Sequence, residues 1–246
     1  MQIPFISSRK PAAPQQEDFL FGLSDGFPIA LGYIPVSFAF GLLAVKGGLP
    51  VWVATLISLT NLTSAGQFAG TNLILAGASL VEITFTTLII NLRYLLMSLS
   101  LSQKLAPGLT LKERSLMAFG ITDETFAVAS VERAEISFPY MLGLITGPYL
   151  GWGTGTLLGG LVCTLLPASL QNALGITLYA MFIALVVPPA KKSRAISLIV
   201  AVAVGLSSAL AWLPGLRFLS EGWRITIATI LACLFGAACF PRKEVD

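Results

Sequence analysis

Apolar residues fill most of the chain in stretches long enough to cross a membrane, and short polar turns separate them. A helix needs about 20 apolar residues to span the hydrocarbon core. The pattern predicts full spans at about residues 27–45, 51–76, 80–101, 138–156, 162–187, 195–213 and 223–240. Residues 115–130 are shorter and only weakly apolar, so we expect them to enter the membrane without crossing it. The predicted fold is an all-α polytopic membrane protein with about seven transmembrane helices and one partial, re-entrant helix.

Composition supports this fold class and excludes several functions. The 246 residues are 55% hydrophobic and 11% charged, with a mean hydropathy of +0.84, whereas soluble domains carry roughly 25% charged residues. The net charge of +3 is too small to indicate nucleic-acid binding. The chain has no histidine, and its three cysteines stand singly in apolar segments. It carries no recognisable catalytic or nucleotide-binding motif. We therefore expect no enzyme activity, no cofactor and no metal.

An internal repeat organises the predicted domain. Residues 1–18 are polar and proline-rich and predict a disordered tail, and residues 19–246 predict a single transmembrane domain. At an offset of 111 residues, Phe27–Ile34 aligns with Phe138–Ile145, and Asn61 aligns with Asn172. The alignment gives a first repeat at about 27–101, a linker segment at 102–137, a second repeat at about 138–213 and a final helix at about 223–240. Asp25 is expected to cap the first span, which places Pro28 in its first turn.

The basic residues predict how the spans are oriented. If residues 115–130 do not cross, ten of the 15 basic residues lie on the cytoplasmic side and four lie outside, as the positive-inside rule favours. The two repeats are then inverted, the amino end lies outside and the carboxyl end is cytoplasmic.

The segment Ser58–Ala76 is the most informative part of the chain, because it is too polar for a lipid-facing helix. Its amides and hydroxyls would find no partners in hydrocarbon, and its glycines Gly66 and Gly70 weaken a helix. We predict a transmembrane helix interrupted around Ser64–Gln67, with a substrate site beside the interruption, as in many transporters. The alternative is close helix packing through small residues. The repeat makes Gly175–Thr177 the second interruption.

Three charged residues inside the apolar region are candidates for substrate binding or proton coupling. Arg93 lies deep in the third span, where a charge must face the protein interior. It either binds the carboxylate of a substrate or forms a structural pair with Asp123, Glu124 or Glu82. Asp123 and Glu124 are the candidates for proton coupling, and their alternative role is helix capping. The predicted substrate-binding set is Asn61, Ser64, Gly66, Gln67, Asn91, Arg93 and Asn172.

Several ordered motifs resemble one known family. The chain carries Asp25-Gly26, Pro28, Gly32, Pro35 and Gly41 in order, then Ser64–Ala69 (SAGQFA), Asn91 with Arg93-Tyr94, and Thr122–Phe126 (TDETF). This set resembles the AzlC family of bacterial branched-chain amino acid permeases, over about residues 19–241. The resemblance implies export of branched-chain amino acids across the bacterial cytoplasmic (inner) membrane by a multi-pass transporter. It also implies that this chain is the larger subunit and works with a small membrane subunit of the AzlD (YgaH-like) type.

Three functional hypotheses follow from these observations. The leading hypothesis is a secondary transporter for small apolar amino acids, driven by the proton gradient. The alternatives are a channel-like pore and a membrane scaffold subunit that does not itself transport.

Overall fold

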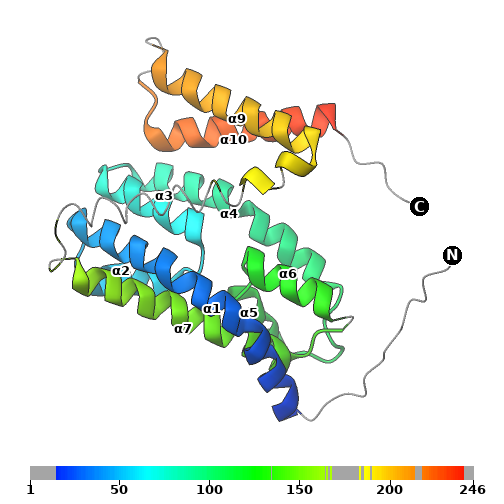
Figure 1. Ribbon diagram of the computed structural model, residues 1–246. Helices are drawn as coiled ribbons and strands as arrows, with labels where there is room; N and C mark the ends of the chain where they lie inside the picture. Colours follow the sequence, from blue (N-terminus) through cyan, green and yellow to red (C-terminus); the bar gives the residue numbers. More distant parts are fainter. Residues whose placement is uncertain are drawn as a thin grey trace. The chain divides into compact units, whose positions relative to one another are not determined.

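The computed structural model describes residues 15–133, 135–163, 165, 167, 183, 186–188, 190–213 and 218–240, and this part of the chain is helical (Figure 1). The helices are α1 Gln15–Lys46, α2 Val51–Thr60, α3 Ser64–Leu75, α4 Leu80–Ser102, α5 Leu111–Phe119, α6 Asp123–Glu132, α7 Phe138–Val162, α9 Arg194–Trp212 and α10 Glu221–Cys239. The predicted all-α class is confirmed for these residues.

Four of the described helices are long and apolar enough to cross a membrane, namely α1, α4, α9 and α10. Helix α7 has 25 residues and hence the necessary length, but it is rich in glycine. The predicted span at 162–187 lies largely outside the described residues. The predicted number of seven full spans is not reproduced, chiefly because residues 51–76 form two short helices in place of one span.

The amino-terminal helix begins earlier than predicted. Helix α1 starts at Gln15, so the last residues of the predicted disordered tail are helical, whereas residues 1–14 lie outside the described part. Asp25 and Pro28 therefore lie inside the helix and do not form its cap and first turn. Asp25 instead accepts a hydrogen bond from the Tyr140 hydroxyl at 2.8 Å. The apolar pattern missed this start because residues 15–18 are polar.

The chain divides into two compact units, Met1–Gly32 with Leu96–Leu150, and Tyr33–Leu95 with Gly151–Asp246. In the first unit, a buried core that includes Tyr140, Met141 and Leu144 joins α1, α5, α6 and α7. The amino-terminal halves of α1 and α7 approach closely, because Gly22 and Gly143 leave no room for a side chain against the facing backbone.

The segment between α4 and α7 returns to its starting point. Ala106 donates to the Ile136 carbonyl at 3.0 Å, and Ile136 donates to the Lys104 carbonyl at 2.8 Å. Residues 115–130, predicted as one partial helix, are divided between α5 and α6. Gly120 ends α5, and the Thr122 hydroxyl caps α6 by accepting from the Thr125 amide. Since its two ends are joined, this segment begins and ends on one side.

In the second unit, α1 and α7 are parallel and packed backbone to backbone. An added methyl group at Gly155 would overlap Ser37 and the Ile34 carbonyl, and one at Gly159 would overlap the Phe38 carbonyl. Residues later in α1 contact residues later in α7, so the two helices run in the same direction. Glycines spaced four apart permit such close approach, as in membrane helix pairs generally.

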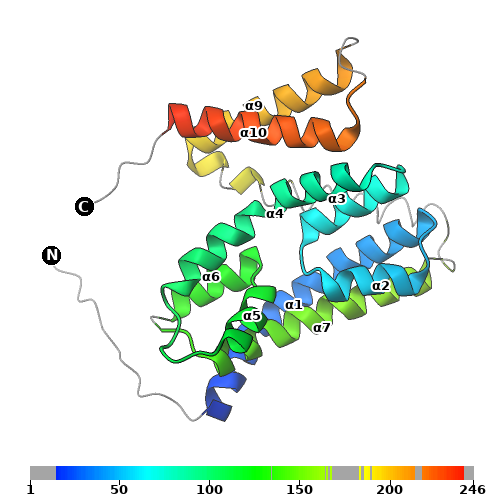
Figure 2. The same cartoon turned by 180° about the vertical axis from the view of Figure 1, so that it is seen from behind.

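Helices α2 and α3 form a hairpin that turns back before it could cross (Figure 2). Val51 at the start of α2 lies near Gly160 of α7, and Leu59 near its end lies by Gly153, so α2 is antiparallel to α7. Leu75 at the end of α3 has returned to Gly47, where the hairpin began. The two helices have 10 and 12 residues, or about 15 and 18 Å of rise. Each covers about half of a 30 Å hydrocarbon core.

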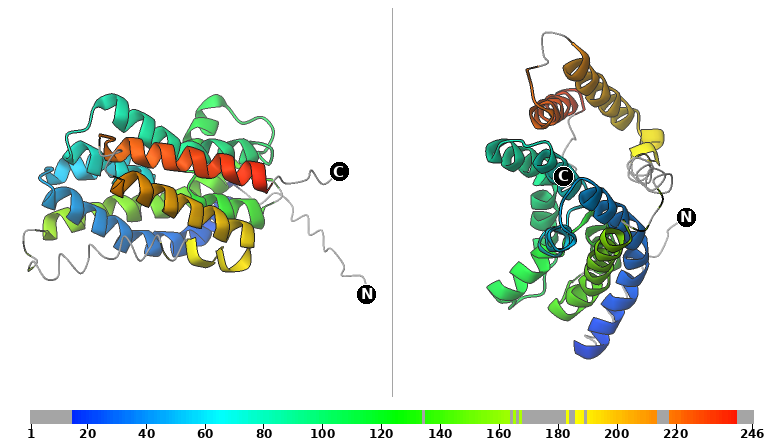
Figure 3. Two further views of the ribbon diagram at one scale, coloured as in Figure 1. Left: turned by 90° about the horizontal axis from the view of Figure 1, so that it is seen from above. Right: turned by 90° about the vertical axis from the view of Figure 1, so that its left-hand side faces the viewer.

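Helices α4, α10 and α9 complete the second unit. Gly66 and Gly70 of α3 face Asn91 and Thr87, so α4 is antiparallel to α3. Contacts between α4 and α10 advance in register, from Glu82 with Gly222 to Thr86 with Thr226, so these helices are parallel. Helices α9 and α10 lie side by side in opposite directions (Figure 3).

These directions correct the predicted topology. The repeats were predicted to be inverted, but the first helix of each, α1 and α7, are parallel. The physical reason is the hairpin of α2 and α3, which removes one of the crossings counted from the apolar pattern. Because α1 and α10 are antiparallel, a chain that crosses with both has its two ends on one side. These directions favour a start of α1 and an end of α10 on the same side, whereas the sequence predicted an amino end outside and a cytoplasmic carboxyl end.

We predict that Gly41→Ala destabilises the protein and that Gly32→Ala on the same helix does not. A methyl group at Gly41 would overlap the Thr156 carbonyl, whereas the position of a methyl group at Gly32 has nothing within 4 Å. Overpacking costs about 1–3 kcal/mol, and replacing an unhindered helical glycine with alanine can gain up to about 1 kcal/mol. Thermal unfolding in detergent would measure both. Equal melting temperatures for the two variants would contradict the close packing of α1 on α7.

Candidate functional site

The interruption between α2 and α3 lies at Asn61–Thr63, three residues before the predicted position at Ser64–Gln67. Asn61 and Thr63 have extended backbone conformations. The Thr63 hydroxyl donates to Asn61 Oδ1 at 2.8 Å and makes no capping bond to α3. Side chains of this kind compete with helical hydrogen bonds. Gly66, which suggested the predicted position, lies inside α3, where it allows Asn91 of α4 to approach.

Gln67 joins the two arms of the hairpin to α7. Its Nε2 donates to the Ser58 hydroxyl at 2.7 Å, and its Oε1 accepts from Trp152 Nε1 at 3.1 Å. The Ser58 hydroxyl in turn bonds the Thr156 hydroxyl at 2.7 Å. Gln67 is only 1% exposed. Since both ends of its amide have partners within the protein, this residue holds the tip of the hairpin in place.

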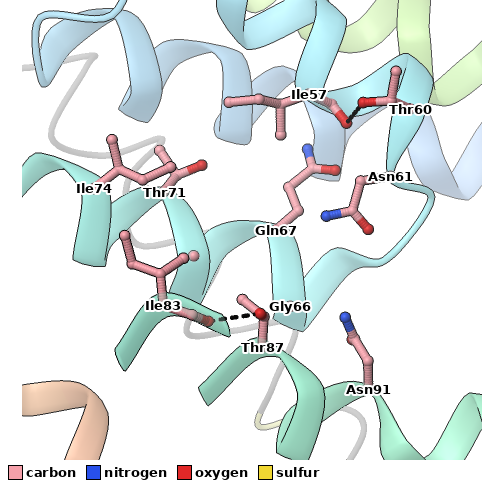
Figure 4. Close-up of a pocket in the computed structure, with 11 residues that line it drawn as sticks. Ile57, Thr60, Asn61, Gly66, Gln67, Thr71, Ile74, Ile83, Thr87 and Asn91 are labelled. Atoms are coloured by element: carbon pink, nitrogen blue, oxygen red, sulfur yellow. Dashed lines mark hydrogen bonds between the residues drawn. The ribbon is translucent and has the colours of Figure 1, made fainter. Parts of the chain in front are cut away.

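A cavity of about 310 Å³ lies between α2, α3 and α4, beside this tip (Figure 4). This volume is at the lower end of the range for small-molecule sites. Among the described residues, the lining mixes isoleucines with amides and hydroxyls and includes no ionisable side chain: Ile57, Thr60, Asn61, Gly66, Gln67, Gly70, Thr71, Ile74, Ile83, Thr87 and Asn91.

Two polar atoms of the lining are buried without a hydrogen-bond partner. They are the hydroxyl oxygen of Thr71, a residue that is 1% exposed, and Oδ1 of Asn91. An unsatisfied buried polar group costs about 1–3 kcal/mol, so such atoms call for an explanation. The other lining hydroxyls of Thr60 and Thr87 donate to carbonyls of their own helices. Thr71 and Asn91 therefore present unused hydrogen-bonding capacity to the cavity.

The ends of the two short helices add a polarity that suits a small ligand with two charges. The first amides of a helix and its last carbonyls lack partners within the helix. They carry partial positive and negative charge, respectively. The start of α3 and the end of α2 both lie at the tip, beside Asn61. A carboxylate is favoured at the first and an ammonium group at the second.

The structure brings together four residues of the predicted substrate-binding set. Asn61, Gly66, Gln67 and Asn91 line the cavity, but Ser64 and Arg93 do not. Asn172 and the predicted second interruption at Gly175–Thr177 lie outside the described residues. The Arg93 guanidinium donates to the Tyr94 hydroxyl at 3.1 Å.

Glu82, one of the acids suggested as a partner for Arg93, has other neighbours. Its carboxylate accepts hydrogen bonds from the hydroxyl of Ser220 and from the amide of Gly222.

Asp123 and Glu124 occupy the first turn of α6, directly after its capping residue Thr122. Acidic side chains are favoured there by the helix dipole. As the helix-capping alternative predicted, Asp123 and Glu124 lie at the start of a helix. The capping residue itself is Thr122. Coupling to protons through these two residues stays a prediction.

Sequence reasoning named Asn91 but left out of the site Thr71 and the other residues, Ile83 and Thr87, of the α4 face that completes the cavity. Thr71 lies one helical turn after Gln67, and Ile83, Thr87 and Asn91 share one face at intervals of four residues. This four-residue spacing indicates a common face of the helix, but it does not show which other helix packs against that face. No group of three or more potential metal ligands occurs within the described residues.

Comparison with known proteins agrees with this description. Residues 28–166 match the family model described as AzlC protein. The chain is 30% identical over 230 residues to the Inner membrane protein YgaZ of Escherichia coli strain K12, which covers 90% of this chain and 91% of that protein. It is 39% identical over 175 residues to an uncharacterized membrane protein of Archaeoglobus fulgidus, covering 70% and 76% of the two chains.

A third relative, an uncharacterized membrane protein of Helicobacter pylori strain 26695, is 32% identical over 154 residues, or 59% of this chain and 66% of that protein. No solved structure matches the chain. The family model covers more than half of the sequence, including both arms of the hairpin and the face of α4 that lines the cavity. The chain belongs to the AzlC family of membrane proteins.

Proposed function

We propose that this protein is a secondary transporter that exports branched-chain amino acids across the bacterial cytoplasmic membrane. The observation that carries the proposal is the cavity at the tip of the hairpin, with the two unpartnered polar atoms of Thr71 and Asn91. Both atoms lack a hydrogen-bond partner within the protein and would gain one from a bound amino acid. The cost of this state favours occupancy by a polar ligand.

The lining also favours an aliphatic side chain on that ligand. Ile57, Ile74 and Ile83 supply apolar surface, whereas Asn61 and Asn91 lie toward the tip and Thr71 lies further along α3 (Figure 4). A zwitterionic amino acid would place its charged groups among these polar atoms and its side chain against the isoleucines. Since the cavity has no ionisable lining residue, it offers no counter-charge to a basic or acidic side chain.

Membership of the AzlC family supports the proposal of transport and agrees with the resemblance found in the sequence. The proposal includes a small membrane partner of the AzlD type and energy from the proton gradient, for which Asp123 and Glu124 are the candidates named from the sequence. A channel-like pore is the competing function, and it would conduct without exchange of bound substrate.

The location of basic residues supports a cytoplasmic position for both ends of the chain. In the first unit, Arg133 pairs with Asp18 near the start of α1. In the second unit, Lys191, Lys192 and Arg194 lie just before or at the start of α9, at the end of the α9–α10 pair where α10 finishes, and Lys46 and Arg224 lie on the opposite side. This asymmetry among the described residues satisfies the positive-inside rule. The hairpin of α2 and α3 then enters from the outer side, and the segment with α5 and α6 enters from the cytoplasm.

Counter-flow in proteoliposomes tests the proposed function. Vesicles loaded with unlabelled valine, leucine or isoleucine should transiently accumulate the labelled amino acid, with or without a co-expressed small partner. Absence of accumulation in every case would refute amino-acid transport by this protein.

We predict that Thr71→Val raises the KM for counter-flow by at least about tenfold, because it removes a hydrogen bond to a charged ligand worth about 1.5–3 kcal/mol. The unfolding temperature should stay equal or rise, since this hydroxyl makes no hydrogen bond within the protein. Thr87→Val is the matched control, because this hydroxyl lines the same cavity but already donates to the Ile83 carbonyl. A larger effect at Thr87 than at Thr71 would contradict the assignment.

We predict that reporters fused to the two ends of the chain both report a cytoplasmic position. A fluorescent protein should be active at either end, and alkaline phosphatase should be active only when inserted in an outer loop, such as the turn at Gly77 after α3. Phosphatase activity at one end together with fluorescence at the other would contradict the opposite directions of α1 and α10.

A further inference from the structure

Glu82 is a buried carboxylate that the proposed function leaves unused. It lies in the first turn of α4 and is 6% exposed. Its Oε1 accepts a hydrogen bond from the Gly222 amide at 2.9 Å and another from the Ser220 hydroxyl. Acidic side chains are rare within the membrane region of a protein and mark proton pathways in many transporters.

These contacts make Glu82 the cap of a neighbouring helix. Ser220 is the capping residue of α10, but its hydroxyl makes no bond to that helix and donates to Glu82 instead. Glu82 provides the cap in place of Ser220, because its carboxylate accepts a hydrogen bond from the Gly222 amide in the first turn of α10. A charged carboxylate is favoured at this position by the helix dipole. A neutral carboxyl group gains much less there, so protonation weakens the attachment of α10 to α4.

Among the described residues, few charged side chains lie near Glu82. In the first turn of α10 they are Glu221 and Arg224, and the Arg224 guanidinium donates to the Leu219 carbonyl. Helix α3, which also contacts α10, has no ionisable side chain. Arg93 lies three turns further along α4. Within the described residues, the contacts of Glu82 with α10 are thus made by a hydroxyl and an amide.

The cavity lies on the adjacent face of the same helix. Glu82 and Thr86 contact α10, whereas Ile83 and Thr87 line the cavity. Successive residues differ by about 100° around a helix, since one turn takes 3.6 residues. A shift of α4 that follows loss of the Glu82 contacts therefore moves Ile83 and Thr87 as well.

We propose that Glu82 is a proton-coupling residue, which links proton binding at the α4–α10 contact to the shape of the substrate cavity. The inference rests on the proposed transport function and names the group that joins it to the proton gradient. A proton from the side where α4 begins forms an O–H bond on the Glu82 carboxylate. The hydrogen bonds from Ser220 and Gly222 then weaken, and α4 and α10 rearrange. After this rearrangement, the proton leaves Glu82 on the other side. Glu82 acts through α4 and does not contact the ligand, so it is a positioning residue.

The test compares two assays on the same proteoliposomes. Counter-flow of labelled leucine needs only exchange of bound substrate, whereas accumulation driven by a pH gradient needs coupling to protons. Glu82→Gln should keep counter-flow within about twofold of the wild type and lose pH-driven accumulation to the level of empty vesicles. Glu221→Gln is the matched control, because it removes the neighbouring acid of α10, and it should retain both activities. Asp123→Asn and Glu124→Gln test the alternative carriers in parallel.

Each outcome decides the inference. Glu82→Gln protein that keeps pH-driven accumulation, or that folds but loses both activities, would overturn it, and the second result would assign Glu82 a structural role. Wild-type protein with counter-flow but without pH-driven accumulation would overturn the inference and leave the transport function standing. Wild-type protein without counter-flow would overturn both.

A second variant keeps the inference testable if Glu82→Gln does not fold. Ser220→Ala removes one hydrogen-bond donor to the carboxylate and thereby destabilises its charged form relative to its protonated form. The external pH at which accumulation is half-maximal should therefore move upward in Ser220→Ala. An unchanged pH profile would overturn the inference.

Discussion

The amide of Gln67 supports the part of the molecule on which the proposed function depends. A chain that turns back inside a membrane leaves backbone groups without helical partners, and hydrocarbon cannot satisfy them. Such a turn persists only where protein surrounds it. Gln67 provides this support by bonding Ser58 on one arm of the hairpin and Trp152 on α7. The close contact of α7 with α1, made possible by glycines, in turn fixes the helix that receives these bonds.

This arrangement separates two kinds of polar group that the sequence does not distinguish. Gln67 and Ser58 use their hydrogen-bonding capacity within the protein, whereas Thr71 and Asn91 carry buried atoms that do not. The first pair therefore holds the hairpin, and the second pair is available to a ligand. Polar residues in one apolar segment can thus have opposite roles, and the distinction comes only from their neighbours in space.

Much of the fold and part of the site could be predicted from the sequence. The apolar pattern gave α4, α9 and α10 to within about two residues. The polar segment after Ser58 correctly indicated an interrupted helix. The pattern could not show that α2 and α3 fold back on each other, because a crossing and a hairpin have the same apolar length. That one ambiguity reversed the predicted relation of α1 to α7.

The site predictions failed where they depended on distant contacts. Arg93 was included because a charge in an apolar span is costly, yet it lies outside the cavity lining. Glu82 was considered only as a partner for Arg93, because its contact with α10 joins residues 140 positions apart. Thr71 is absent from the predicted set, because its sequence context does not show that its hydroxyl lacks the backbone hydrogen bond that Thr87 makes. Such contacts are set by packing and leave no local pattern.

Binding of a branched-chain amino acid at the tip of the α2–α3 hairpin can be tested by ligand protection of a single cysteine. Asn61→Cys, in a background with Cys163, Cys233 and Cys239 replaced by alanine, places a thiol at the edge of the cavity. The rate of its reaction with a small maleimide in proteoliposomes is measured with leucine or with arginine added. If leucine binds there, it should slow the reaction of this thiol with the maleimide in a saturable, concentration-dependent way, and arginine should not. A rate that leucine leaves unchanged at every concentration would contradict binding at this tip.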